Sequence, residues 1–448
     1  MNWIDELLDR GADTDPWLVA DGAETRSDLR RAVAARAESL PDIAPGSIVA
    51  LRLPPGPAAL HALFALWRLD AQVVLVDTRL PAPEVERLYG LHPPTHELTE
   101  AGLDHLGAGA DPGDIRLVQF SSGSTGLPKV IGRTAADLHA EIERYAVLDG
   151  MPRRGERVLL LNSLIHTMGL IGGVLHGLAS GTGLVLPLGT RAAGWVERAA
   201  EHRVAAILGV PLHFELLSRT TPPPLPDLRL AVSAGEMLPP AVNSAFEARF
   251  GVPVSPVYGT TETGILTAEL TKPCPPPGVG RPVANTTVRV TNGELYVRLD
   301  RSPYLRADGV DRFDDGWLRT FDRAELGEDG ATISILGRAD SVVTVAGLKI
   351  DLMEVEAVLR AHPGVTEAVV VHSGAAVEAY VGAPEEVTAA DLLRWCRERL
   401  SDFKVPKRFA VDRAVPRNPT GKLIRSHELL HAHRGEGDPH ANAADRQL

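Results

Sequence analysis

The segment from residue 118 to residue 129, VQFSSGSTGLPK, contains the residue types that bind phosphate groups. An apolar run leads into six residues that are only serine, threonine and glycine, and Lys129 closes the segment. Glycine lets the backbone approach an anion, while hydroxyl and backbone N–H groups donate hydrogen bonds to phosphate oxygens. The spacing excludes a Walker loop. A flexible surface turn is the alternative, but the apolar run before the loop and the lysine after it favour an anion site.

Three further segments carry groups that a nucleoside triphosphate site needs. The segment 257–264, VYGTTETG, offers an aromatic face, two adjacent hydroxyls and a carboxylate, which suit base stacking, phosphate binding and Mg²⁺. Asp322 ends the run WLRTFD, where its carboxylate could accept both ribose hydroxyls, and Arg338 follows in GRAD. Taken alone, Asp322 is typical of a turn carboxylate and Arg338 of a solvated surface charge. Four such segments in one chain predict a nucleotide site.

Lys422 stands in a turn-forming segment near the C-terminus, 415–425, VPRNPTGKLIR. The chain has six lysines against forty arginines, which by itself indicates the codon bias of a GC-rich genome. A lysine ammonium is a compact point charge that arginine does not replace. We therefore predict that this loop delivers Lys422 to the reaction as a mobile cation.

Short β-rich runs alternate with helical patterns, which predicts an α/β fold with mostly parallel sheets covered by helices. From residue 278 onward short strands predict a small β subdomain, and a small α+β domain follows a boundary near 337–341. A chain of 448 residues also exceeds one typical domain. The predicted strands are 48–53, 73–76, 116–120, 157–161, 183–187, 205–208, 228–232, 254–257, 287–290, 293–298, 315–320, 342–345, 367–372 and 379–381, and the predicted helices are 58–69, 169–179, 192–202, 239–250, 352–361 and 389–399.

The composition limits the partners of the chain. Its net charge of −12 argues against binding to nucleic acid or to an anionic membrane surface. Two cysteines without metal-ligand spacing suit a reducing cytoplasm, and the acidic N-terminus is unlike a signal peptide. The stretch 158–190 has no charged residue, but its glycines and histidines favour a buried segment over a membrane span. We expect a cytoplasmic monomer or homodimer.

The motifs SSGSTGLPK, YGTTETG, GWLRTFD, GRADSVVTVAGLKI and NPTGKL resemble, in order and spacing, those of the adenylate-forming superfamily. This family includes acyl-CoA synthetases, luciferases and the adenylation domains of peptide synthetases. The resemblance runs from about residue 20 to about residue 430 and is closest in type to an AMP-forming acid–CoA ligase. It implies an AMP-binding domain over 1–337, a hinge at 338–341, a mobile lid domain over 342–433 and a disordered tail over 434–448.

The resemblance also implies roles around the triphosphate. The serine- and glycine-rich loop would handle the β- and γ-phosphates, Thr261 would bind the α-phosphate and Glu262 the Mg²⁺ ion. Lys422 would bridge the carboxylate and the α-phosphate during adenylation. The loop residues are Ser121, Ser122, Gly123, Ser124, Thr125, Gly126 and Lys129, the adenine-pocket residues are Ser233, Ala234, Gly235, Glu236 and Tyr258, and Gly259 and Thr260 complete the nucleotide-binding set.

Further roles concern the ribose, the hinge and the acyl group. Asp322 and Arg338 match the ribose ligands, and Asp340 matches the residue about which the small domain turns. His166 falls where the family often has a histidine or aromatic residue that gates the acyl pocket. A histidine satisfied within the core is the alternative for His166.

For the second half-reaction, the resemblance implies that the segment 345–349 replaces Lys422 at the site. Gly347 would line a narrow channel for a thiol, because it has no side chain, and Lys349 belongs to the same segment. A simple turn glycine is the alternative for Gly347.

Two features depart from the family pattern. Phe321 stands in Arg-Thr-Phe-Asp where the family usually has Arg-Thr-Gly-Asp, so a bulky ring lies next to the predicted ribose ligand. The segment before Ser121 is also shorter than usual. Neither departure removes a reacting group, but both bear on the wall of the ATP site and on the N-terminal architecture.

We therefore expect an enzyme that uses ATP and Mg²⁺ to convert a carboxylic acid to an acyl-adenylate. The segments 162–169, 208–214 and 233–264 are mainly small and apolar, which favours an aromatic or medium-length apolar acid. Coenzyme A is the expected acceptor, because no carrier domain is fused to the sequence. A carrier-protein thiol, an amine or a small inorganic acid are alternatives. Glu262, Asp322 and Lys422 together argue against a non-catalytic adenylate-binding accessory module.

Overall fold

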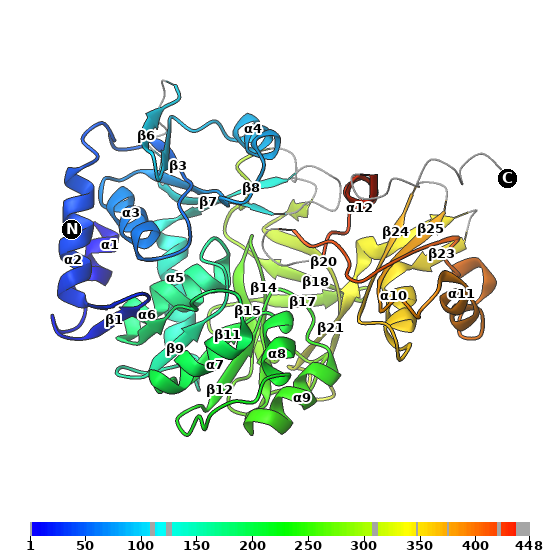
Figure 1. The fold of residues 1–448 in the computed structure, drawn as a ribbon. Helices are drawn as coiled ribbons and strands as arrows, with labels where there is room; N and C mark the ends of the chain where they lie inside the picture. The colour runs from blue at the N-terminus through cyan, green and yellow to red at the C-terminus, as the bar shows by residue number, and fades with distance from the viewer. Residues whose placement is uncertain are drawn as a thin grey trace. The chain divides into compact units, whose positions relative to one another are not determined.

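The structure is a computed structural model that describes residues 2–107, 113–121, 128–306, 312–345, 348–373, 376–418 and 423–435 (Figure 1). The described residues form two compact units. The large unit comprises 2–121, 128–320 and 324–336, and the small unit comprises 321–323 and 337–435, within these described ranges.

A seven-stranded sheet in the large unit has the order β13-β12-β11-β9-β10-β1-β2. All neighbouring strands are parallel except β1 and β2. Alternate residues point to opposite faces of each strand, so one strand contributes to two cores. The bounds are β1 Pro16–Val19, β2 Ala23–Thr25, β9 Arg157–Leu160, β10 Gly183–Val185, β11 Ala206–Gly209, β12 Leu230–Ser233 and β13 Val254–Pro256.

A six-stranded sheet has the order β6-β5-β3-β4-β7-β8. Strands β5, β3, β4 and β7 are parallel neighbours, while β6 and β8 pair antiparallel at the two edges. The mostly parallel character of both sheets confirms the predicted fold class. The bounds are β3 Ile48–Leu51, β4 Gln72–Leu75, β5 His96–Thr99, β6 Gly102–His105, β7 Ile115–Ser121 and β8 Lys129–Thr134.

Helices cover both faces of the two sheets and give the large unit a five-layered core (Figure 1). A central layer of α1, α2, α3, α5 and α6 packs between the sheets, so α3 is buried nearly all round. Helices α7, α8 and α9 cover the outer face of the seven-stranded sheet, and α4 covers that of the other. The bounds are α1 Trp3–Leu8, α2 Arg26–Glu38, α3 Pro57–Arg68, α4 Ala82–Leu91, α5 Ala135–Ala146, α6 His176–Ser180, α7 Ala192–Glu201, α8 Pro211–Ser218 and α9 Pro240–Phe250.

The uncharged stretch 158–190 forms a buried strand–helix–strand segment, as predicted, but its helix is of two kinds. A π-helix over Met168–Leu175 precedes α6, and close packing at its glycines leaves no room for side chains. A Cβ on Gly169 would overlap with the Ser163 carbonyl, and one on Gly173 would overlap with Leu160. Among the described residues, no helix has the length and apolar character that crossing a bilayer requires.

The predicted β subdomain consists of two sheets. Strands β14, β15 and β16 form an antiparallel sheet, and β17, β18, β20 and β19 form a second sheet in which β21 also pairs with β20. The hairpin of β14 and β15 carries the YGTTETG motif. The bounds are β14 Tyr258–Thr260, β15 Gly264–Ala268, β16 Arg281–Pro282, β17 Val288–Thr291, β18 Glu294–Arg298, β19 Phe313–Asp314, β20 Trp317–Leu326 and β21 Ile333–Arg338.

The small unit is the predicted α+β fold. A hairpin of β22 and β23 precedes a three-stranded sheet of β24, β25 and β26, and α10 and α11 pack on that sheet around a separate apolar core. Helix α12 was not predicted, and it includes the first two residues of the predicted tail; the rest of that tail lies outside the described residues. The bounds are β22 Val342–Val345, β23 Leu348–Asp351, α10 Leu352–Arg360, β24 Glu367–His372, β25 Val377–Gly382, α11 Ala389–Arg397, β26 Arg408–Asp412 and α12 His427–Gly435.

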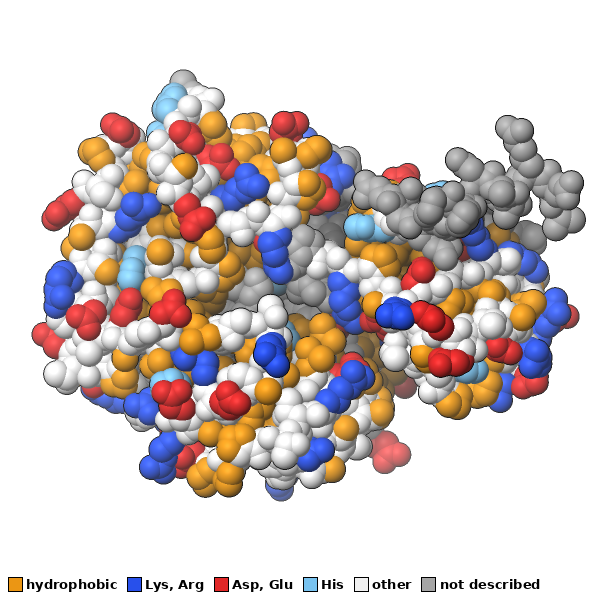
Figure 2. Space-filling model, viewed as in Figure 1, with side chains coloured by type: hydrophobic (Ala, Val, Ile, Leu, Met, Phe, Trp, Pro, Cys, Tyr) orange, Lys and Arg blue, Asp and Glu red, His pale blue; other side chains and the backbone are white. Residues whose placement is uncertain are grey.

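Surface charge of both signs is intermixed on the face shown in Figure 2, where Lys and Arg side chains alternate with Asp and Glu. Exposed charges of the chain are also paired across short distances, as in Arg203 with Asp227 and Arg229 with Glu156. Exposed pairs of this kind contribute little to the free energy of unfolding. Intermixed charges of both signs break up the potential that a continuous basic patch would create.

Candidate active site

The carboxyl ends of four parallel strands meet at one edge of the seven-stranded sheet. Leu160 lies opposite Leu208, Gly209 opposite Ser233, and Ser233 opposite Pro256. The segments that follow these strands include the predicted acyl gate, the predicted adenine pocket and the YGTTETG motif. Ligands of open α/β sheets bind at such an edge. The fold therefore brings these three predicted regions together within the large unit.

The predicted phosphate loop lies at the edge of the six-stranded sheet. Strand β7 ends at Ser121 and β8 begins at Lys129, and these two residues are cross-strand partners. Lys129 is only 7% exposed, and its ammonium lies 5.6 Å from the centre of the Tyr304 ring. The rest of the predicted loop, from Ser122 to Gly126, lies outside the described residues.

Thr261 and Glu262 lie in the tight turn that joins β14 to β15. The Thr263 hydroxyl is within 3.1 Å of the Thr260 hydroxyl, accepts a hydrogen bond from the Thr260 N–H and donates one to the Gly264 carbonyl. These bonds close the turn on itself. Thr261 and Glu262 are half-buried, so the turn presents a hydroxyl and a carboxylate from a fixed backbone.

Tyr304 is a site residue that the motifs did not indicate. Its hydroxyl donates a hydrogen bond of 3.2 Å to Oε1 of Glu262. Burial and the neighbouring carboxylate raise the pKa of Tyr304, so the phenol stays protonated as the donor. Because Tyr304 is 42 positions from Glu262 and has no nearby motif, no sequence signal identified it.

The backbone around Tyr304 is held against β8. Gly132 donates its N–H to the Pro303 carbonyl at 3.0 Å, and Leu305 donates to the Val130 carbonyl at 3.0 Å. Ile131 and Tyr304 form a β-bridge between these bonds. The strand that begins with Lys129 therefore also fixes the tyrosine that contacts Glu262.

The predicted adenine pocket starts at the end of β12. Ser233 is buried, and its Oγ has no hydrogen-bond partner among the described residues, which suits a polar group of a bound base. Gly235 has a φ of +89°, a conformation that favours glycine, and Glu236 is exposed. Tyr258 is half-buried and packs beside Leu295, which leaves part of its ring exposed.

His166 lies just before the π-helix and is half-buried. Gln119 fixes this segment to β7, because its Nε2 donates to the Ile165 carbonyl at 2.8 Å while its Oε1 accepts from the Thr167 hydroxyl at 3.4 Å. His166 is close enough to Asp77 to contribute, by charge interaction, to the lowered pKa of that carboxyl. The partial exposure of His166 suits a residue at a pocket wall better than one enclosed in the core.

In the small unit, Asp322 and Arg338 lie together as the ribose prediction requires. Arg338 Nη1 is 3.4 Å from Asp322 Oδ1, and Asp322 is only 7% exposed. The structure describes the backbone of Asp340 and Lys349 but not their side chains. Gly347 and Lys422 lie outside the described residues. The roles of these four stay predictions, as do the individual roles of the other site residues.

Phe321 adopts a φ of +62°, a left-handed conformation that glycine accepts at no cost and other residues do not. Phe321 therefore carries a backbone strain that a glycine at this position would not. Strain of this kind persists where neighbouring structure enforces it, often at a binding site.

The strain at Phe321 gives a stability prediction. Phe321→Gly and Phe321→Ala both remove the ring, but only alanine keeps the left-handed penalty. We expect Phe321→Gly to have the higher free energy of unfolding by about 1 kcal/mol, measured by urea denaturation. Ala324→Gly, at an ordinary φ in the same strand, should instead be destabilising. Equal stability of the two Phe321 variants would contradict the prediction.

The described residues fit ATP and Mg²⁺. Glu262 and the threonines beside it supply hard oxygen ligands of the kind that Mg²⁺ prefers, and no soft ligand stands among them. Lys129 supplies a buried cation for phosphate oxygens, and Ser233 supplies an unsatisfied polar group for the base. Among the described residues no cluster of three or more histidine, cysteine or acidic side chains forms a separate metal site.

Known proteins share sequence with this chain over most of its length. The family model of the AMP-binding enzymes matches residues 91–300, and that of the AMP-binding enzyme C-terminal domain matches residues 354–422. The chain is 28% identical to a probable CoA ligase, CCL9, of Humulus lupulus, over 70% of this chain and 66% of that protein. It is 30% identical to a sulfoacetate–CoA ligase of Cupriavidus necator, over 85% of this chain and 77% of that protein.

A solved structure shares the fold over nearly the whole chain. The O-succinylbenzoate coenzyme A synthetase of Bacillus subtilis, in complex with ATP and magnesium ion, has a TM-score of 0.80 and 22% identity over 95% of this chain and 98% of that one. The two family models together cover more than half of the sequence, in the order that the motifs predict. The chain therefore belongs to the AMP-binding enzyme family, the adenylate-forming superfamily that its motifs resemble, and is an AMP-forming ligase of the acid–CoA type.

Proposed function

We propose that this ligase joins an aromatic or medium-length apolar carboxylic acid to coenzyme A through an acyl-adenylate. The single observation that carries the proposal is the placement of Tyr304. Its hydroxyl binds Glu262, the predicted Mg²⁺ ligand, while its ring lies beside Lys129, the predicted phosphate lysine. One side chain thus connects the two groups that would handle the triphosphate.

In the proposed first half-reaction, a carboxylate oxygen of the acid forms a bond to the α-phosphorus of ATP, and the bond to pyrophosphate breaks. The difficulty is electrostatic, because a carboxylate approaches an anionic phosphate chain. Lys129 would neutralise charge on the leaving pyrophosphate, and Lys422 would neutralise the oxygens around the α-phosphorus. A bound Mg²⁺ held by Glu262 would supply further charge stabilisation of the phosphate oxygens.

In the proposed second half-reaction, the sulfur of coenzyme A forms a bond to the acyl carbon, and the bond from that carbon to AMP breaks. The thiol proton leaves as the thioester forms. In both steps the bonds form and break at the carboxyl group of the acid. The rest of the acid takes no part in the chemistry, so an apolar acid is compatible with both steps.

The acid preference rests on the pocket segments. The ranges 162–169, 208–214 and 233–264 contain no lysine and one arginine, Arg249, which is exposed on α9 and donates to the Ser218 carbonyl. Burial lowers the pKa of His213 to about 4, so this histidine is neutral near pH 7 and adds no positive charge. A second anionic group on the acid would therefore be buried without a partner, at a large cost in free energy.

A pyrophosphate-release screen over carboxylic acids tests the proposal. We expect release with aromatic and medium-length apolar acids, little release with dicarboxylates, and a coenzyme A thioester detectable by mass spectrometry. Parallel reactions with a carrier protein, an amine or hydroxylamine identify another acceptor if the thioester does not form. Failure of every acid to release pyrophosphate would favour a non-catalytic adenylate-binding module and overturn the proposal.

Gly347→Leu tests the acceptor separately from adenylation. If Gly347 lines the thiol channel, a leucine side chain there blocks coenzyme A but leaves the acid and ATP unaffected. We expect thioester formation to fall at least about tenfold, while acid-dependent pyrophosphate exchange stays within about twofold. The reason is that the thiol channel serves only the second half-reaction. Thioester formation that survives unchanged would contradict the channel role.

A further inference from the structure

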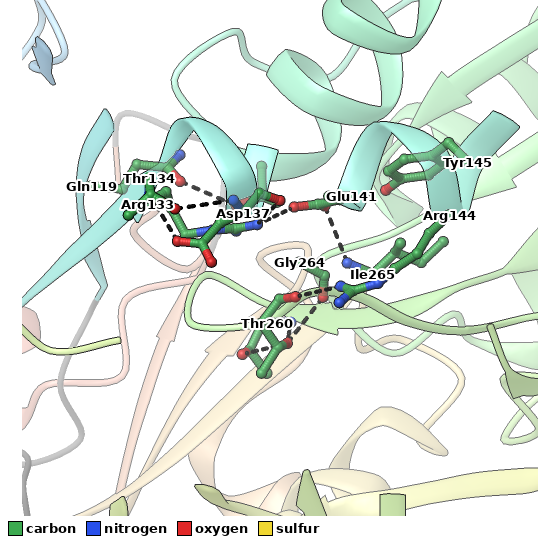
Figure 3. Close-up of polar contacts among 12 residues, drawn as sticks. Gln119, Arg133, Thr134, Asp137, Glu141, Arg144, Tyr145, Thr260, Gly264 and Ile265 are labelled. Atoms are coloured by element: carbon green, nitrogen blue, oxygen red, sulfur yellow. Dashed lines mark hydrogen bonds and ion pairs between the residues drawn. The ribbon is translucent and has the colours of Figure 1, made fainter. Parts of the chain in front are cut away.

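A buried ion pair contacts the strand that follows the Glu262 turn. Arg133, on β8, and Glu141, on α5, are 4% and 0% exposed, and Arg133 Nη2 donates to Glu141 Oε2 at 2.6 Å (Figure 3). Both residues belong to the large unit. Burying two charges is costly in desolvation free energy, and only a close pair with further hydrogen bonds offsets that cost.

The other oxygen of Glu141 contacts the strand that follows the turn. Glu141 Oε1 accepts the backbone N–H of Ile265 at 3.1 Å, a bond that spans 124 positions in sequence. Gly264 permits this approach, because a Cβ at that position would overlap with the Glu141 carboxylate. The φ of Gly264 is +70°, which also favours glycine.

A second side chain of α5 binds the turn itself. Arg144 Nη1 donates to the Thr263 carbonyl at 3.3 Å, and burial lowers the pKa of Arg144 below its usual range. Figure 3 shows Arg133, Glu141 and Arg144 in line along one side of α5, with Thr260 and Gly264 below them. Thr263 and Ile265, which both follow Glu262, are thus held by one helix.

The helix is itself fixed to the strand that begins with Lys129. The Thr134 N–H donates to Asp137 at 2.8 Å and the Asp137 N–H donates to the Thr134 hydroxyl at 3.1 Å, so a capping box starts α5 directly after β8. Arg301, which also pairs with Asp137, joins this start to the segment that carries Tyr304. The same strand–helix corner therefore positions Lys129 and anchors the Glu262 turn.

We propose that Glu141, held by Arg133, is a positioning residue that fixes the 260–264 turn so that Glu262 can hold Mg²⁺ with ATP. Glu141 does not touch the reacting atoms; it acts through the backbone of Ile265. The proposal rests on the proposed function, since it concerns the metal ligand of the same site. An ion pair that served only the fold would leave the affinity for Mg·ATP unchanged.

The test is Mg·ATP binding by isothermal titration calorimetry, without acid, in the full-length chain. Glu141→Met keeps the length of the side chain but removes both carboxylate oxygens, and with them the bond to the Ile265 N–H. We expect its Kd for Mg·ATP to rise about 10- to 100-fold, as is typical when a supporting group behind a metal ligand is lost. In turnover assays the KM for ATP should rise while the KM for the acid stays unchanged.

Controls separate positioning from folding. Glu143→Gln changes an exposed carboxylate two positions along α5 and should bind like wild type. Removing one partner of a buried pair can prevent folding, whereas replacing both by apolar residues is tolerated. The double variant Arg133→Met with Glu141→Leu therefore keeps a folded core but loses the bond to Ile265, and Arg144→Gln removes the half-buried second contact. Both should weaken binding in the same direction.

The outcomes are distinct. A folded Glu141→Met or double variant whose Kd for Mg·ATP stays within twofold of wild type overturns the positioning role. If wild type itself does not bind Mg·ATP, the proposed function fails instead. A weaker Kd together with unchanged thermal unfolding of the ligand-free chain supports the inference.

Discussion

Replacing Lys422 by alanine is expected to lower acid-dependent pyrophosphate exchange by about 100- to 1000-fold, or about 3–4 kcal/mol of transition-state stabilisation. The carboxylate of the acid and the α-phosphate both carry negative charge, and this charge is concentrated as the new bond forms. A lysine that meets both oxygens stabilises the transition state more than the separate reactants. Its removal should therefore act on the rate and not only on binding.

The measurement is exchange of labelled pyrophosphate into ATP, with the best acid from the screen. Lys407→Ala, which removes an exposed lysine of the same unit, is the matched control and should keep the wild-type rate. Lys422→Arg adds a second comparison, because guanidinium keeps the charge but not the compact geometry. Exchange at the wild-type rate in Lys422→Ala would show that another cation serves the α-phosphate.

Much of the site could be predicted because its residues form local motifs. The YGTTETG segment is an antiparallel hairpin whose turn carries Thr261 and Glu262, and such a turn is specified by neighbouring residues. Ser121 and Lys129 flank one loop, and the strands on either side follow from their apolar residues. The mostly parallel sheets follow from alternating strand and helix patterns, which the structure confirms.

The supporting residues could not be predicted, because their partners are distant in sequence. Glu141 contacts Ile265, and Tyr304 contacts Glu262, only after two sheets and a helix have packed together. Nothing in the local pattern around Glu141 separates it from Glu143, which is exposed. A single sequence shows residue types and spacing, while these contacts depend on tertiary packing.

Backbone requirements were predicted in part. The family comparison marked Phe321 as unusual, but only the structure shows that its φ of +62° is one that glycine adopts more readily than phenylalanine. The π-helix over Met168–Leu175 was likewise predicted only as a helix, because the apolar pattern does not distinguish the two helix types. Its three glycines are explained by contacts with Ser163, Leu160 and Tyr145.

Glu262→Gln is expected to lower acid-dependent pyrophosphate exchange by about 100- to 1000-fold at a fixed Mg²⁺ concentration. Glutamine keeps an oxygen that can accept from Tyr304, so the turn stays in place, but it removes the negative charge that binds the metal. The loss should therefore shrink as Mg²⁺ is raised, because mass action restores part of the bound metal.

A Mg²⁺ titration of the exchange rate distinguishes this role from a general defect. Glu247→Gln, an exposed glutamate on α9 of the same unit, is the matched control and should follow the wild-type curve. A Glu262→Gln curve that is lower at every Mg²⁺ concentration by the same factor would mean that Glu262 acts on the turn or on Tyr304 and not as a metal ligand. A curve displaced to higher Mg²⁺ would instead link the charge of Glu262 to metal binding.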